Sequence, residues 1–139
     1  MMKVCLFMVA FFVSNSAFAA EETNKADWYT MTYATADAVK AGAASSCKLT
    51  ITPAKNHVMK SETPFKVMLK GTDGVKVEKD KYTSKDWQDP KAAEKVIQTK
   101  FTAAAAGKHA LNADLTFFIC NDEVCKRFKD KADCAISAK

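Results

Sequence analysis

Two cysteines separated by four residues, Cys120 and Cys125, are the side chains of this sequence with the clearest capacity for chemistry. They lie in the segment TFFICNDEVCKRF. Such a pair can form a disulfide that only stabilises the fold, exchange electrons with another thiol, or bind a metal ion. The acidic residues between the cysteines raise the pKa of a nearby thiol, and the basic residues that follow lower it. Local charge therefore leaves all three uses open.

The other residue types that could do chemistry give weaker signals. His57 and Met59 would suit copper, but the chain has only two histidines and no His-x-His or Cys-x-x-Cys array. A zinc site would require reduced cysteines that converge on one point. The sequence contains no G-x-S-x-G motif and no glycine-rich nucleotide loop. We predict no metal and no cofactor.

The first 19 residues, MMKVCLFMVAFFVSNSAFA, have the features of a secretory signal peptide. A lysine precedes a short apolar run, and a small-residue A-x-A ending follows it. The run is too short to span a bilayer, which takes about 20 apolar residues. We predict cleavage after Ala19 or one residue later, no membrane span afterwards, and an exported protein that is periplasmic or secreted. Four cysteines then remain, and an even count in an exported chain favours disulfides.

Alternating apolar and polar residues predict that the rest of the chain is all-β. A flexible segment over residues 20–27 should precede one domain over 28–139, with one short helix possible near 88–95, where Pro90 suits a first helical turn. Short strands joined by turns favour an antiparallel β-sandwich of immunoglobulin-like type. About seven strands are expected, near residues 28–33, 43–52, 65–71, 75–82, 96–102, 109–120 and 125–137.

The same alternation sorts the four cysteines into two kinds. Cys47 and Cys134 have the parity of their apolar neighbours and should point into the core. Cys120 and Cys125 have the opposite parity and should face solvent across one hairpin. Four cysteines allow three pairings, and parity favours a buried Cys47–Cys134 bond and an exposed Cys120–Cys125 bond.

The formal net charge of +5 comes mainly from single lysines at alternate positions, as in KVMLKGTDGVKVEKDKY. Lysines spaced in this way are typical of the wet faces and edges of sheets. We therefore predict no nucleic-acid partner.

Three segments together resemble a known family: TPAKNHVMKSETPFKVML, FTAAAAGKHALNADLTFF and the hairpin CNDEVC. From Trp28 to Ile136 the chain resembles the immunoglobulin-like periplasmic domain at the amino end of DsbD-type thiol–disulfide interchange proteins. The resemblance implies that Cys120 and Cys125 are the catalytic pair, although their spacing is shorter than in that family and CKRF replaces its tyrosine-proline.

Two functions follow as hypotheses. The first is an exported thiol–disulfide exchange module that acts on a protein partner through Cys120 and Cys125. We assign Phe118 and Phe128, which flank this pair in sequence, to docking of that partner. The second is a disulfide-stabilised β-sandwich that binds an envelope component without redox chemistry.

Overall fold

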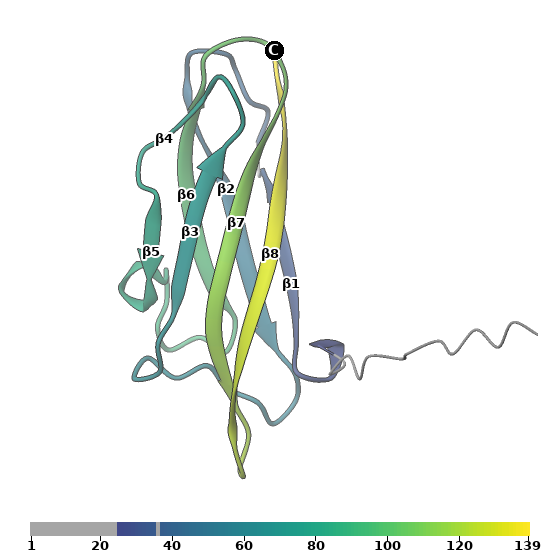
Figure 1. The fold of residues 1–139 in the computed structure, drawn as a ribbon, viewed down its shortest axis with the longest axis vertical. Coiled ribbons are helices and arrows are strands. Elements are labelled where there is room, and N and C mark those ends of the chain that lie inside the picture. Colours follow the sequence, from purple (N-terminus) through teal and green to yellow (C-terminus); the bar gives the residue numbers. More distant parts are fainter. Residues whose placement is uncertain (1–24, 36) are drawn as a thin grey trace, which may run out of the picture.

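The computed structural model describes residues 25–35 and 37–139, and these form two packed four-stranded sheets (Figure 1). One sheet has the order β1-β2-β6-β4 and the other β5-β3-β7-β8, and all neighbouring strands within the sheets pair antiparallel. The predicted signal peptide lies outside the described residues. The strands are β1 Tyr29–Thr35, β2 Ala44–Pro53, β3 Lys66–Gly71, β4 Val75–Val77, β5 Lys81–Thr83, β6 Lys95–Ala103, β7 Gly107–Cys120 and β8 Cys125–Ala138, with 3-10 turns at Lys25–Asp27 and Ser84–Asp86.

The predicted all-β sandwich is confirmed. Apart from the three-residue β5, the strand order matches the two sheets of an immunoglobulin constant-type domain. The long strands form where the sequence alternates most regularly, because each then buries one row of side chains between the sheets. Leu49 and Ile51 of β2 and Leu115 and Phe117 of β7 are each no more than 2% exposed.

Residues 75–82, predicted as one strand, instead form two short strands in different sheets. Val75–Val77 pairs with β6, whereas Lys81–Thr83 pairs with β3. The crossing between the sheets is held by backbone bonds from Glu78 N–H to the Lys100 carbonyl and from Leu69 N–H to the Asp80 carbonyl. The lysines that suggested a continuous strand mark the outer edges of both sheets.

The short helix expected near residues 88–95 is absent, and turns replace it. The Lys95 side chain is 5% exposed, and its Nζ donates to the carbonyls of Pro90 and Ala92 at 2.8 and 2.6 Å. The same amine lies 4.7 Å from the centre of the Trp87 ring. Burial lowers the pKa of Lys95. Carbonyls that a helix would have bound internally thus coordinate a buried cation, and the segment folds around that amine.

Two edge strands from opposite sheets, β1 and β8, are joined by polar contacts. The Tyr29 hydroxyl donates to Asp130 Oδ2 at 2.5 Å, and Lys25 Nζ lies 3.4 Å from Asp130 Oδ1. Burial raises the pKa of Asp130, but the bonds from Tyr29, the Lys131 backbone and Lys25 outweigh it, and the net pKa is lowered. The 3-10 turn at Lys25–Asp27, within the segment expected to be flexible, supplies one of these partners.

None of the helical turns in the described part of the chain has the length and apolar character to cross a bilayer.

Candidate functional site

The candidate site lies at the tip of the hairpin between β7 and β8, which extends beyond the other strands at the bottom of Figure 1. Cys120 and Cys125 are register partners, and their disulfide is formed as predicted. Asn121 shapes the turn: its N–H donates to the Val124 carbonyl, and its Oδ1 accepts from the N–H groups of Glu123 and Val124 at 2.9 and 2.8 Å. An asparagine that binds the backbone in this way is typical of tight turns.

Backbone geometry explains why the two sulfurs meet. Both backbone hydrogen bonds of Cys120 go to Val58 on its other side, at 2.8 and 2.9 Å. Cys120 and Cys125 therefore form the non-hydrogen-bonded type of antiparallel pair, in which side chains approach most closely. Their Cα atoms are 3.9 Å apart.

The two cysteines of this disulfide differ in exposure. Cys125 is exposed, as predicted, whereas Cys120 is only 1% exposed, so the prediction that both face solvent is wrong for Cys120. The outward parity of Cys120 is correct, but the segment around Val58 lies alongside it as a short extra bridge. This segment reaches β7 because Asn56 adopts a positive φ of 63° and turns the chain back.

Sequence reasoning missed a group of aromatic and basic residues beside the hairpin. The rings of Trp28 and His57 meet edge to face with centroids 4.8 Å apart. Lys126, the residue after Cys125, places its Nζ 5.5 Å from the centre of the Trp28 ring. These residues come from three separate parts of the chain, and no pattern in the sequence linked them.

Two exposed apolar side chains lie in segments that adjoin the hairpin disulfide. Val58 is 50% exposed and Val124 is 53% exposed. Val58 is bonded to Cys120 through its backbone, and Val124 immediately precedes Cys125. Among the described residues, only Met68 is a further large apolar side chain with comparable exposure, at 38%. Exposed apolar groups therefore concentrate around the one disulfide that reaches the surface.

The second disulfide, Cys47–Cys134, is formed as predicted and has the opposite environment. Both cysteines are 0% exposed, and the bond joins β2 in one sheet to β8 in the other. The Tyr33 hydroxyl lies 2.8 Å from Thr99 Oγ1, which donates to the Cys47 carbonyl at 3.0 Å. Burial raises the pKa of Tyr33 to about 12. No opening reaches these sulfurs, so this bond serves the fold.

The two phenylalanines assigned to docking have different positions. Phe118 is half-buried on the outer side of β7, opposite Arg127 of β8. Phe128 is 4% exposed and packs against Tyr29 and Phe117, with ring centroids 5.0 and 5.9 Å away. Phe128 is therefore a core residue, and its burial does not fit the docking role assigned to it.

The remaining candidates offer no reactive grouping. Met59 is 6% exposed in the core, and His57 Nδ1 lies 2.8 Å from the Lys55 carbonyl. Across residues 25–35 and 37–139, no cluster of three or more His, Cys, Asp or Glu side chains could hold a metal ion.

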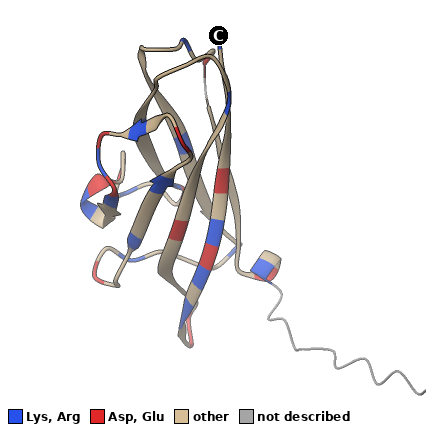
Figure 2. Cartoon of the chain, turned by 45° about the horizontal axis from the view of Figure 1, so that its top comes forward, with Lys and Arg blue, Asp and Glu red and all other residues tan. Residues whose placement is uncertain are grey.

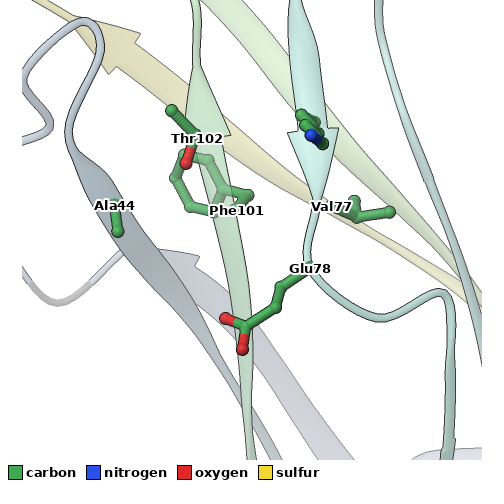
Figure 3. Close-up of a pocket in the computed structure, with 6 residues that line it drawn as sticks. Ala44, Val77, Glu78, Phe101 and Thr102 are labelled. Carbon is green, nitrogen blue, oxygen red and sulfur yellow. The ribbon is translucent and has the colours of Figure 1, made fainter.

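A shallow pocket of about 220 Å³ lies between β2, β4 and β6 on the other sheet (Figure 3), lined by Ala44, Lys76, Val77, Glu78, Phe101 and Thr102. Its lining contains no cysteine, serine or histidine.

Comparison with models of known protein families and with curated protein sequences finds no match for this chain. The structure thus gives the protein as a β-sandwich with two disulfides, and the disulfides indicate an exported protein. The function must be inferred from the site itself.

Proposed function

We propose that this protein is an exported, periplasmic or secreted thiol–disulfide exchange module that acts through Cys120 and Cys125. The observation that carries the proposal is the contrast between the two disulfides. One is sealed between the sheets, and the other presents Cys125 at a projecting hairpin, next to exposed Val58 and Val124. Accessible disulfides are the ones that exchange readily, and exposed apolar groups commonly mark contact surfaces.

Because Cys125 is exposed and Cys120 is buried, we expect the partner to attack Cys125 first. A partner thiolate attacks Cys125 Sγ, the bond to Cys120 Sγ breaks, and Cys120 leaves as a thiolate that takes up a proton from water. The partner is then joined to Cys125 in a mixed disulfide. A second partner thiolate attacks the partner's own sulfur and releases Cys125 as a thiolate. Two electrons have passed from the partner dithiol to the hairpin pair, and the reverse sequence delivers them to a partner disulfide.

A hairpin clip that stays oxidised, in a sandwich that binds an envelope component, is the second candidate. The burial of Cys120, with both backbone groups bonded to Val58, favours it. A partner can reach this disulfide only at Cys125, and the thiolate formed at Cys120 would lie away from water. Burial in apolar surroundings raises a thiol pKa and makes it a poorer leaving group.

The reduction potential of the hairpin bond separates the two functions. The protein is equilibrated in glutathione buffers of stepped potential, free thiols are alkylated, and each cysteine pair is quantified by peptide mass spectrometry. A potential near about −200 mV supports exchange, and one below about −300 mV refutes it in favour of the clip. The sealed Cys47–Cys134 bond in the same molecule is the matched control and should stay oxidised throughout.

The order of events has its own test. The variant Cys120→Ser keeps the exposed thiol and should form a mixed disulfide with a model partner disulfide. The variant Cys125→Ser keeps the buried thiol and should react at least about tenfold more slowly. Equal rates for the two variants would contradict attack at Cys125.

A further inference from the structure

The exposed cysteine belongs to a row of basic side chains along the outer face of β8. Residues two apart on a strand point to the same side, and here Cys125, Arg127, Lys129 and Lys131 are all exposed. At about 3.4 Å per residue, this row extends about 20 Å from the sulfur. The length equals that of about six residues of an extended peptide.

The neighbouring strands widen the row into a basic sheet face. In the register of the sheet, Lys129 is followed by Thr116 of β7 and then Lys66 of β3. Lys70 lies further along β3, and Lys81 of β5 lies opposite Met68. Figure 2 shows these strands with blue bands that outnumber the red ones. The acidic residues on this face of the strands are Asp114 and Asp133.

Most of these cations have no ion-pair partner within the described part of the chain. The exception is Lys131, whose Nζ lies 3.9 Å from Asp114 Oδ1, and both side chains are highly exposed. A pair of that kind contributes about 0–1 kcal/mol and leaves the charge available. A shallow depression of about 310 Å³ lies in the same region, lined by residues 114–116 and 129–131, which include Lys129 and Lys131 and the carboxylates of Asp114 and Asp130.

The outer face of the opposite sheet is different. Its strands expose mainly threonine, serine and glutamine side chains, and three lysines, Lys48, Lys76 and Lys100, are spread across them. The sheet that carries the hairpin disulfide thus exposes more basic side chains than the opposite sheet. Solvation alone would make both faces equally suitable for lysine.

We infer that the outer face of β8 and β7 docks an acidic cysteine-bearing segment of a protein partner, which lies along the strand and presents its thiol to Cys125. The inference rests on the proposed function and names the chemistry of the partner. Charge complementarity favours an acidic segment, and continuity of the basic row with Cys125 fixes its direction. Asp122 and Glu123 occupy the turn beyond the disulfide, so an acidic segment is repelled from the tip and directed along β8.

The test uses three synthetic peptides that carry one cysteine beside four acidic, four lysine or four serine residues. Each peptide reduces the oxidised protein, and stopped-flow or quenched sampling gives the second-order rate constant. The same peptide's rate with the neutral hydroxyethyl disulfide corrects for its own thiol pKa. We expect the corrected rate constant of the acidic peptide to exceed that of the lysine peptide by about tenfold or more in about 20 mM salt. The ratio should approach one in about 0.5 M salt.

Two double variants with equal change of net charge locate the effect. Lys129→Glu with Lys131→Glu should bring the ratio to one or below. The control Lys48→Glu with Lys100→Glu, on the opposite sheet, should leave it within about twofold of the original. The double variant Lys129→Ser with Lys131→Ser is a second test variant. Urea midpoints verify that each variant is folded.

A wild-type ratio near one, or equal effects of the two glutamate double variants, would overturn the inference. So would binding of a cysteine-free oligonucleotide to this face together with no preference among the peptides. The rate measurements are independent of the reduction potential. A potential below about −300 mV together with a faster rate for the acidic peptide refutes exchange as the function but leaves the docking face. A potential near about −200 mV together with equal rates for the peptides refutes the docking face alone.

Discussion

Removal of the buried disulfide should destabilise this protein far more than removal of the hairpin disulfide. The Cys47–Cys134 bond closes a loop with a sequence separation of 87, and the Cys120–Cys125 bond closes one of 5. In the chain-entropy model, a disulfide stabilises the fold by lowering the conformational entropy of the unfolded chain. This contribution is about 4.6 kcal/mol for the Cys47–Cys134 bond and about 2 kcal/mol for the Cys120–Cys125 bond. The difference from loop length alone is therefore about 2.5 kcal/mol.

Packing adds to this difference. Cys47 and Cys134 are fully buried, so their replacement by alanine leaves cavities that each cost on the order of 1 kcal/mol. In the hairpin pair only Cys120 is buried, and replacement of the exposed Cys125 leaves no cavity. The double variant Cys47→Ala with Cys134→Ala should thus lose about 5–7 kcal/mol, which is a large part of the total for a typical domain.

Urea unfolding followed by tryptophan fluorescence measures the effect on both double variants. With an m-value of about 2 kcal/mol/M, the midpoints should differ by at least about 1 M. The variant Cys120→Ser with Cys125→Ser should stay folded with a modestly lower midpoint. If both double variants unfold at the same urea concentration, the assignment of one bond to the fold and the other to the surface is wrong.

Two further predictions concern single positions. Because the net pKa of Asp130 is lowered in the folded protein, its contribution to stability is present above about pH 4 and is lost as the pH falls through the folded pKa. Asp130→Asn should therefore lower the urea midpoint at pH 7 and flatten its decline between about pH 5 and pH 2; a decline as steep as in the wild type would contradict the contact. A Cβ at Gly71 would lie 2.9 Å from both the Cβ and the carbonyl oxygen of Val75, so Gly71→Ala should cost about 1–3 kcal/mol. At Gly42 there is no neighbour within 4 Å but φ is +79°, so Gly42→Ala should cost about 1 kcal/mol; a melting temperature lowered more by the second change than by the first would refute this ranking.

The sequence was sufficient for those parts of the fold in which alternation is long and regular. Strands β2, β7 and β8 each turn one row of side chains toward the interior, so parity alone placed Cys47 and Cys134 in the core and gave the correct pairing. A long strand has no other way to bury an apolar row between two sheets. The same reasoning correctly predicted that Cys125 would face solvent.

The structure of short segments was harder to predict from the sequence, because it depends on their contacts with distant parts of the chain. Residues 75–82 alternate well enough for one strand, yet hydrogen bonds to β6 and to β3 divide them between the sheets. The segment that begins at Pro90 has residues suited to a helix, but its carbonyls at Pro90 and Ala92 accept hydrogen bonds from the buried Lys95 amine instead. In both cases tertiary contacts outweigh a local preference of a few tenths of a kcal/mol per residue.

The burial of Cys120 shows why parity could not settle the function. Parity tells which side of its own sheet a residue faces, but access to solvent also depends on segments distant in the sequence. Here Val58 pairs with β7 at Cys120, which is buried, whereas its disulfide partner Cys125 stays exposed. A disulfide with one open end can be attacked at Cys125 only, and the rate of that attack depends on how well the buried Cys120 thiolate is accommodated. The reduction potential bears on the same burial, because it reports the free-energy difference between the disulfide and the reduced pair, in which the Cys120 sulfur must be accommodated inside the protein.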